Sequence, residues 1–179
     1  MMILASQSPR RKELIRKLID DFIVIPADID ENVKNVAPSD LPALLSKLKA
    51  YSIFATHPND TVLACDTVVI HKGELMGKPK TKEEAISMLK KLSGDKHVVL
   101  SGYTFINKNK EITRSVKTVV HFNKLSDETI LKYVESGSPM DKAGGYGIQD
   151  KEYNLVDYIE GSLDNVIGLP VEDIKKHCF

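Results

Sequence analysis

The hydrophobic positions of this chain follow two periods, and each period predicts one kind of element. Short apolar runs predict buried strands over residues 1–6, 21–26, 62–70 and 155–159. Apolar residues at helical spacing predict helices over residues 8–19, 39–55, 81–93, 126–135 and 171–179. Two longer strand candidates, 97–106 and 112–122, are joined by a polar turn. Strands and helices alternate first and long hairpins come later, which predicts an α/β fold with a mixed sheet.

Capping residues predict where several helices begin and end. Ser8 is an N-cap residue with Pro9 in the first helical position after it. Thr81 and Glu84 have the spacing of a capping box. Gly137 is the expected C′ residue after the helix over 126–135. The helix over 39–55 is expected to bury one face, made of Leu41, Leu44, Leu45, Leu48 and Tyr51.

One acidic residue lies in the middle of the apolar run VLACDTVVI, residues 62–70. Strand alternation places Asp66 on one face of this strand and Thr67 on the other. A buried carboxylate without a partner is strongly destabilising. We therefore expect Asp66 to face a cleft or to pair with a cation or a metal. The alternative is a structural Asp that accepts hydrogen bonds from backbone amides.

The charges of the 179-residue chain balance, with 25 Lys and Arg against 25 Asp and Glu. Nucleic-acid binders usually carry a basic excess, so no nucleic-acid partner is expected. The length suits one domain, or two small lobes that share a sheet, and we interpret residues 1–179 as a single domain. Cys65 and Cys178 lack the spacing of zinc ligands. Cys65 is expected to pack as a small hydrophobic residue.

No signal peptide or membrane segment is predicted. The first apolar stretch is short, and its arginines follow it instead of preceding it. No apolar run approaches the roughly 18 residues of a membrane-spanning helix. The expected location is therefore the cytoplasm, with no membrane partner. The motifs of serine hydrolases and of zinc proteases are also absent, which argues against acyl-transfer chemistry.

The stretch SQSPRR, residues 6–11, joins a strand to a helix. A helix N-terminus leaves backbone N–H groups free, and its dipole favours an anion. Ser6 and Ser8 add hydroxyl groups, and Arg10 and Arg11 add guanidinium groups that match phosphate geometry. The stretch is therefore a candidate phosphate site. The alternative is a capped surface helix with two solvated arginines.

Three acidic residues, Asp28, Asp30 and Glu31, lie in the loop ADIDE. Taken alone, this loop is best interpreted as a solvated acidic turn. Together with Asp66, however, it could hold Mg²⁺ or Mn²⁺. These ions usually bind one or two carboxylates together with the phosphates of the substrate.

Two further segments could contact a nucleotide. Pro79 restrains the backbone beside Lys78, which could present its ammonium group to a phosphate, and Lys49 is a second candidate. The loop DKAGGYGIQD, residues 141–150, has three glycines that allow close approach to a ligand. Gln149 in this loop has both a donor and an acceptor for the edge of a base. The alternatives are solvated lysines and a plain flexible loop.

Seven stretches occur in one order along nearly the whole chain: LASQSPRRKEL, DIDE, CDTVV, GKP, LSG, SGSPMDKAGGYGIQ and EGSLDNVIGLP. In this the sequence resembles the Maf family, the septum-formation-inhibitor-like nucleotide pyrophosphatases. The resemblance implies an α/β fold similar to that of inosine triphosphate pyrophosphatases. In that fold an elongated mixed sheet is flanked by helices, and two lobes enclose a central cleft.

The resemblance also implies an activity. Maf proteins hydrolyse nucleoside triphosphates between the α and β phosphates and need a divalent cation, Mg²⁺ or Mn²⁺. It implies catalytic roles for Asp66, Glu31 and Lys78, with Glu31 and Asp66 as metal ligands. The substrate-binding residues that it implies are Ser6, Ser8, Arg10, Arg11, Lys49, Thr67 and Gln149.

The form KAG-x-YGIQ resembles the dTTP/UTP branch of the family. The implied substrates are dTTP, UTP and related modified pyrimidine nucleotides, and a homodimer is the implied assembly. Two positions differ from the usual pattern: Gly145 stands where Ala is usual, and Asp150 where Gly is usual. The alternative function is a nucleotide-binding regulator of cell division and septum formation with little catalysis.

Overall fold

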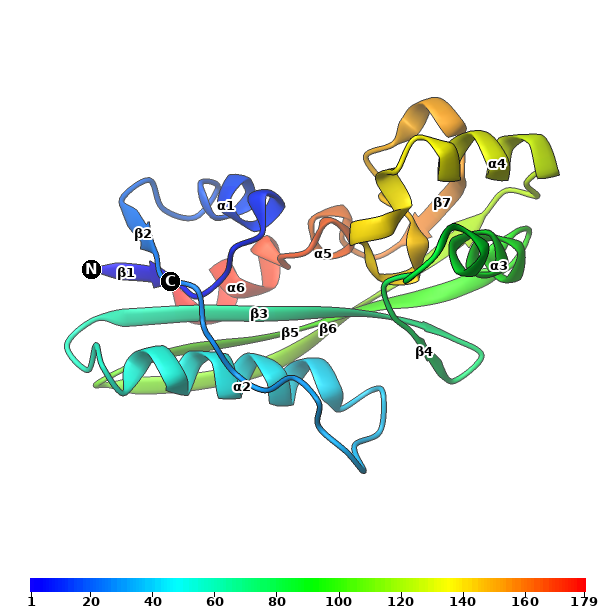
Figure 1. Ribbon diagram of the computed structural model, residues 1–179. Helices are drawn as coiled ribbons and strands as arrows, with labels where there is room; N and C mark the ends of the chain where they lie inside the picture. Colours follow the sequence, from blue (N-terminus) through cyan, green and yellow to red (C-terminus); the bar gives the residue numbers. More distant parts are fainter. The chain divides into compact units, whose positions relative to one another are not determined.

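The structure is a computed structural model that describes residues 1–179, and it contains seven strands and six α-helices (Figure 1). The strands are β1 (Met2–Leu4), β2 (Phe22–Val24), β3 (Thr61–His71), β4 (Glu74–Met76), β5 (Lys96–Asn107), β6 (Lys110–Phe122) and β7 (Val156–Glu160). The helices are α1 (Pro9–Ile15), α2 (Leu41–Phe54), α3 (Lys82–Leu92), α4 (Asp127–Glu135), α5 (Leu163–Ile167) and α6 (Val171–Cys178). Short 3₁₀ turns are η1 (Ser138–Asp141), η2 (Ala143–Gly145) and η3 (Lys151–Tyr153).

The strands form one mixed sheet in the order β2-β1-β3-β5-β6-β7, with β4 paired to β3. Strand β1 runs parallel to both β2 and β3. The hairpin β3–β4 and the pair β6–β7 are antiparallel. The prediction of an α/β fold with a mixed sheet flanked by helices is therefore confirmed. None of the helices is long and apolar enough to cross a membrane.

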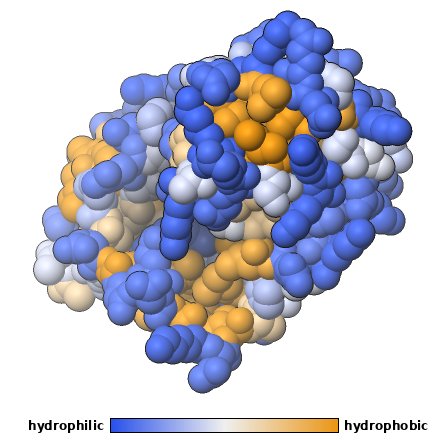
Figure 2. Space-filling model, turned by 45° about the vertical axis from the view of Figure 1, so that its right-hand side comes forward, coloured by the Kyte–Doolittle hydropathy of each residue, from blue (hydrophilic) through white to orange (hydrophobic).

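The chain divides into two compact units. The first contains residues 1–67, 100–116 and 164–179, and the second contains residues 68–99 and 117–163. The central cleft and the single-domain interpretation both stay predictions. In the view of Figure 2 the surface is largely hydrophilic, with separate hydrophobic patches.

The core of the first unit lies on both faces of β1 and β3. Leu63 and Cys65 pack on one face in a cluster with Leu4. Val62 and Ala64 pack on the other face with Ile3 and other apolar residues. This alternation is the one predicted for residues 62–70, and Cys65 is fully buried as expected. Because both flanks of β3 are anchored in apolar clusters, the strand is a firm support for the polar residues that follow.

The buried face of α2 differs from the prediction. Leu48 and Tyr51 are 38% and 40% exposed, while the buried residues of the helix are Pro42, Leu45, Ser46, Ala50 and Ile53. Gly102 on β5 explains the difference, because a Cβ atom there would lie 2.2 Å from the backbone N of Ala43. The start of the helix therefore packs directly against the backbone of the sheet, and Leu48 and Tyr51 lie on the outward side.

The predicted caps are present. Ser8 and Ser126 accept hydrogen bonds from the third residue after each of them, at the starts of α1 and α4. Thr81 accepts from the Glu84 N–H at 3.1 Å, but the Glu84 carboxylate accepts from the Lys80 N–H instead of the Thr81 N–H that a capping box predicts. Gly137 follows α4 with a positive φ of 78°. Helix α5 and the 3₁₀ turns were not predicted, because their residues show no sustained periodicity.

Candidate active site

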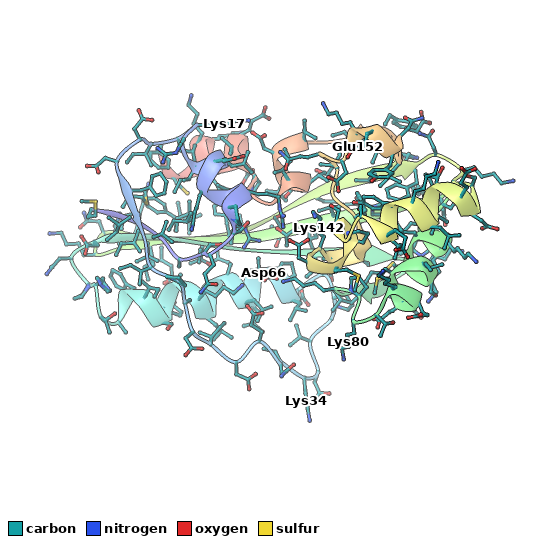
Figure 3. All side chains as sticks on the ribbon, turned by 45° about the horizontal axis from the view of Figure 1, so that its top comes forward. Lys17, Lys34, Asp66, Lys80, Lys142 and Glu152 are labelled. Carbon is teal, nitrogen blue, oxygen red and sulfur yellow. The ribbon has the colours of Figure 1, made fainter.

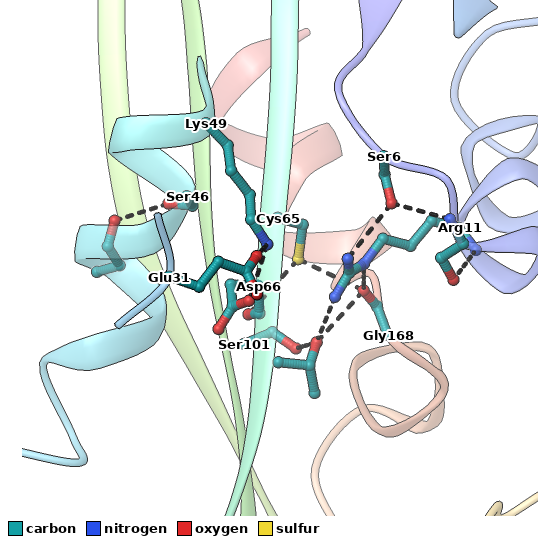
Figure 4. Close-up of polar contacts among 12 residues, drawn as sticks. Ser6, Arg11, Glu31, Ser46, Lys49, Cys65, Asp66, Ser101 and Gly168 are labelled. Atoms are coloured by element: carbon teal, nitrogen blue, oxygen red, sulfur yellow. Dashed lines mark hydrogen bonds and ion pairs between the residues drawn. The ribbon is translucent and has the colours of Figure 1, made fainter. Parts of the chain in front are cut away.

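Three charged side chains meet on one face of β3, and we call them the carboxylate cluster: Glu31, Lys49 and Asp66 (Figure 4). The Lys49 Nζ lies 3.0 Å from Asp66 Oδ1 and 2.8 Å from Glu31 Oε1. The Lys49 and Asp66 side chains are only 13% and 14% exposed, while Glu31 is 58% exposed. The predicted cationic partner of Asp66 is therefore Lys49, which α2 presents from its buried side. Figure 3 shows Asp66 on β3 above this helix.

The oxygen atoms of the carboxylate cluster fit a divalent cation. No hydrogen bond reaches Asp66 Oδ2 or Glu31 Oε2, and the Lys49 ammonium contacts Oδ1 of Asp66 and Oε1 of Glu31. Two hard oxygen donors, completed by substrate phosphates, suit Mg²⁺ or Mn²⁺. Asp30 is engaged elsewhere, since its Oδ1 accepts from the Asn32 N–H at 2.9 Å. The chain contains no group of three or more His, Cys, Asp or Glu residues that could hold a metal without substrate.

A second polar set lies on the other face of β3, and we call it the arginine chain: Arg11, Thr67 and Ser101 (Figure 4). Arg11 donates from Nη2 to Thr67 Oγ1 at 3.2 Å and from Nε to the Gly168 carbonyl at 2.7 Å. Thr67 Oγ1 and Ser101 Oγ are 2.7 Å apart, and Ser101 donates to the Asn165 carbonyl at 3.3 Å. Either hydroxyl can donate in this contact, because Ser101 has the Asn165 carbonyl as a second acceptor and Thr67 has the Gly168 carbonyl at 3.5 Å.

The loop after β1 leaves several donors available to a ligand. Ser6 Oγ accepts from the Ser8 N–H at 3.2 Å and from Arg11 Nη1 at 3.4 Å, and Ser8 Oγ accepts from the Arg11 N–H at 3.4 Å. Neither hydroxyl has an acceptor for its own proton. Arg10 makes no hydrogen bond or ion pair. These groups can therefore donate to a phosphate without breaking an existing bond, whereas Arg11 would bind with its remaining N–H groups.

Asp66 and Thr67 leave β3 on opposite faces, as the alternation predicted, and they belong to different polar sets. The pairing of β1 with β3 ends at Leu4 and Leu63. Asp66 and Thr67 follow three and four residues later, so β1 no longer covers that edge of β3. Asp66 and Thr67 therefore lie beyond the last pair of residues that joins β3 to β1.

Two predicted residues, Lys78 and Gln149, belong to the second unit, and both side chains are exposed there without a hydrogen bond or ion pair. Their segments are neighbours within that unit, because the Gly144 N–H donates to the Gly77 carbonyl at 3.1 Å. A Cβ on Gly144 would lie 3.1 Å from Val69 Cγ1, so only glycine allows this close packing. The two predicted substrate segments of this unit therefore lie side by side.

The Tyr146 side chain anchors the glycine-rich loop in the second unit. Tyr146 is buried, and its hydroxyl lies 2.6 Å from His97 Nε2. Burial lowers the pKa of His97 to about 4, so the ring is neutral near pH 7. His97 packs edge-on against Phe122 and Tyr146. The loop is therefore fixed to the core by an aromatic cluster.

Sequence reasoning gave no role to Ser101 or Gly168. Both lie in stretches that carry the family resemblance, LSG and EGSLDNVIGLP, but a hydroxyl and a backbone carbonyl have no chemical signature of their own. The one sequence signal for Gly168 was its position just before Leu169 and Pro170, where a helix is expected to end. Its φ of 136° is a conformation that favours glycine, and its carbonyl accepts from Arg11 and from Cys65 Sγ, at 2.7 and 3.4 Å.

Comparisons with known proteins show the family to which the chain belongs. The model of the family described as Maf-like protein matches residues 1–178. The chain belongs to the Maf family.

Among its relatives are proteins named dTTP/UTP pyrophosphatase. The one from Thermosipho africanus is 49% identical over 97% of this chain and 89% of the relative. Those from Thermococcus gammatolerans and Pyrococcus furiosus are 44% and 43% identical, over 98% and 95% of this chain and 94% and 90% of theirs. Among solved structures, the Staphylococcus aureus Ham1 protein superposes with a TM-score of 0.48 at 16% identity, over 70% of this chain and 72% of that chain.

Proposed function

We propose that this protein is a nucleoside triphosphate pyrophosphatase that hydrolyses dTTP and UTP, and related modified pyrimidine nucleotides, to the monophosphate and pyrophosphate. The observation that carries the proposal is the carboxylate cluster, in which Glu31 and Asp66 both contact the Lys49 ammonium and each has one oxygen without a hydrogen bond. The names of the relatives support the choice of substrates. The proposed location is the cytoplasm.

In this proposal the chain supplies a base, a metal site and phosphate donors. Asp66 accepts a proton from a water molecule that attacks the α-phosphorus, and the bond between the α-phosphorus and the bridging oxygen breaks. The Lys49 ammonium, with Lys78, stabilises the negative charge that moves to the pyrophosphate leaving group. A divalent cation held by Glu31 and Asp66 would neutralise charge on the triphosphate.

The loop after β1 binds the phosphates in the same proposal. Ser6 and Ser8 donate their free hydroxyl protons, Arg10 adds a mobile positive charge, and Arg11 is held in one orientation by its three partners. A guanidinium that is already oriented loses little further freedom when it binds phosphate. Thr67 and Gln149 are the proposed determinants for the base, and Gln149 can pair with a pyrimidine edge through its amide.

The test is a product assay on a panel of the eight common ribo- and deoxyribonucleoside triphosphates, with Mg²⁺ or Mn²⁺. We expect monophosphate and pyrophosphate in equal amounts, with dTTP and UTP turned over most efficiently and no turnover after chelation. Diphosphate with inorganic phosphate as products would overturn the assignment of the bond that is cleaved. Nucleotide binding without turnover would instead favour the regulatory alternative, and full turnover in excess EDTA would remove the metal.

A further inference from the structure

The end of the glycine-rich loop in the second unit is tied down by one carboxylate. Asp150 Oδ2 accepts hydrogen bonds from the Tyr133 hydroxyl at 2.5 Å and from the Ser138 hydroxyl at 2.6 Å. Tyr133 belongs to α4 and is fully buried, and Ser138 begins η1. The same Tyr133 hydroxyl accepts from the Gly147 N–H at 2.9 Å. One tyrosine hydroxyl therefore holds two points of the loop, three residues apart.

The hydroxyl protons of both Tyr133 and Ser138 are available to Asp150. Burial and the bond to Asp150 raise the pKa of Tyr133, so its hydroxyl stays protonated and keeps donating. Lys142 donates to the Ser138 carbonyl and hydroxyl at 2.7 and 3.1 Å, which leaves the Ser138 proton for Asp150. A Cβ on Gly147 would lie 2.8 Å from Lys142 Cε and 3.2 Å from Asp150 Oδ2, so the backbone passes close to both side chains.

A cavity of about 370 Å³ borders the loop, lined in part by Gly147, Ile148 and Asp150. Where the loop faces this space it has no packing contacts, so the polar bonds of Asp150 help to fix its position. Gln149 does not line this cavity, and its exposed side chain has no partner. Its direction is therefore set by the backbone on each side of it.

We propose that Asp150 is a positioning residue, which fixes the loop through Tyr133 and Ser138 so that Gln149 discriminates between nucleobases. This inference rests on the proposed function, in which Gln149 contacts the base. Asp150 contacts neither substrate nor reacting atoms. Tyr146, held by His97, fixes the loop before Gln149, and Asp150 fixes it immediately after. Loss of the bonds from Tyr133 and Ser138 to Asp150 therefore frees the backbone that carries Gln149.

The experiment compares Asp150→Ala with Asp150→Asn, because the amide oxygen of Asn can still accept from Tyr133 and Ser138. The readout is the ratio of kcat/KM for UTP to kcat/KM for CTP. We expect Asp150→Ala to lower this ratio about 5- to 10-fold through a higher KM for UTP, the size expected for one hydrogen bond to the base. Asp150→Asn should keep the ratio. Asp157→Ala, an exposed Asp on β7 without a partner, is the matched control.

A second set of variants shows whether Asp150 acts through Gln149. Gln149→Ala should lower the ratio, and adding Asp150→Ala to it should lower the ratio no further. If Gln149→Ala lowers the ratio and Asp150→Ala does not, the inference is wrong while the proposed function stands. If Gln149→Ala leaves the ratio unchanged, the proposed base contact is wrong, and positioning through it is overturned as well.

Amide hydrogen exchange tests the anchor without any turnover. In Asp150→Ala, the amides of residues 147–151 should exchange at least about 10-fold faster, while those of α3 keep the wild-type rate. A loop that exchanges at the wild-type rate would overturn the inference whatever the kinetics. An equal fall in kcat for UTP and CTP, with an unchanged ratio, would show a general structural role and would also overturn it.

Discussion

The carboxylate cluster and the arginine chain occupy the two faces of the same strand, and they differ in how much hydrogen-bonding capacity they leave unused. In the carboxylate cluster, Asp66 and Glu31 share one ammonium group, and each has one oxygen without a hydrogen bond. In the arginine chain, each proton of Thr67 and Ser101 already has an acceptor within the protein. The first set can therefore take up a ligand or a proton, while the second holds Arg11 in place.

This difference gives the two sets different roles: the carboxylate cluster can take part in the reaction, while the arginine chain orients Arg11 before substrate binds. A carboxylate with an open oxygen can act on water or a cation, and it tolerates the charge only because Lys49 is beside it. A saturated chain of hydroxyl groups gains nothing from a ligand, but it removes the freedom of the guanidinium before substrate arrives. Substitutions in the two sets should consequently have different kinetic signatures.

The largest effect is expected from Asp66→Asn, which removes the base and keeps the shape of the side chain. Turnover should fall by at least about 10³-fold, in line with the loss of a general base, while far-UV circular dichroism and urea unfolding show an intact fold. Pyrophosphate release from dTTP is the measurement. Asp21→Asn, the same change at an exposed Asp of the first unit without a partner, should leave turnover unchanged. Near-normal release by Asp66→Asn would refute the division between the two sets.

A smaller effect is expected from Thr67→Val, which keeps the shape and deletes the hydroxyl that joins Arg11 to Ser101. The fully buried Ser101 loses its hydrogen-bond partner Thr67, so the free energy of unfolding should fall by about 1–3 kcal/mol. We expect kcat/KM to fall about 10-fold, equally for all nucleotides, because Arg11 becomes less well oriented. Thr67→Ser should restore both values.

The Thr67 variants also decide between two roles for that residue. The proposed function assigns Thr67 to the base, and that assignment stays a prediction. If Thr67→Val shifts the preference between UTP and CTP, the hydroxyl contacts the base and the arginine chain is more than a support. A loss as large as that of Asp66→Asn would place Thr67 at the reacting centre and would remove the contrast between the two faces.

Of the two polar sets on β3, the sequence pointed only to the one that contains Asp66. An ionised group in a run of apolar residues is conspicuous, because burial without a partner is strongly disfavoured. Its partner was one of 25 Lys and Arg residues, and spacing could not select it. Lys49 was a candidate for a phosphate contact and not for Asp66, and it lay outside the predicted apolar face of α2. The close approach of Gly102 to Ala43 sets the face of the helix that packs on the sheet, and Lys49 lies on that side.

Other parts of the site depend on contacts between segments that are distant in sequence. Strand alternation correctly separated Asp66 from Thr67, since it is a property of one strand. The arginine chain combines a hydroxyl of β5 and a carbonyl after α5, and neither has a local pattern. Asp150 was noticed only as a departure from the family pattern, and its bonds to Tyr133 and Ser138 follow from the packing of α4.

The smallest effect is expected at Ser8, where the two kinds of role meet in one hydroxyl. Its oxygen caps α1, and its proton has no acceptor in the protein. Ser8→Ala should lower the free energy of unfolding by about 1 kcal/mol and raise KM about 3-fold, as expected for one cap and one phosphate bond. Ser8→Asp should restore stability, because Asp is an equally good cap, and yet raise KM further by repelling the triphosphate. Ser52→Asp, at an exposed position of α2, controls for the added charge. If Ser8→Asp binds substrate like the wild type, Ser8 is a cap alone, and phosphate binding in this loop falls to Ser6 and the two arginines.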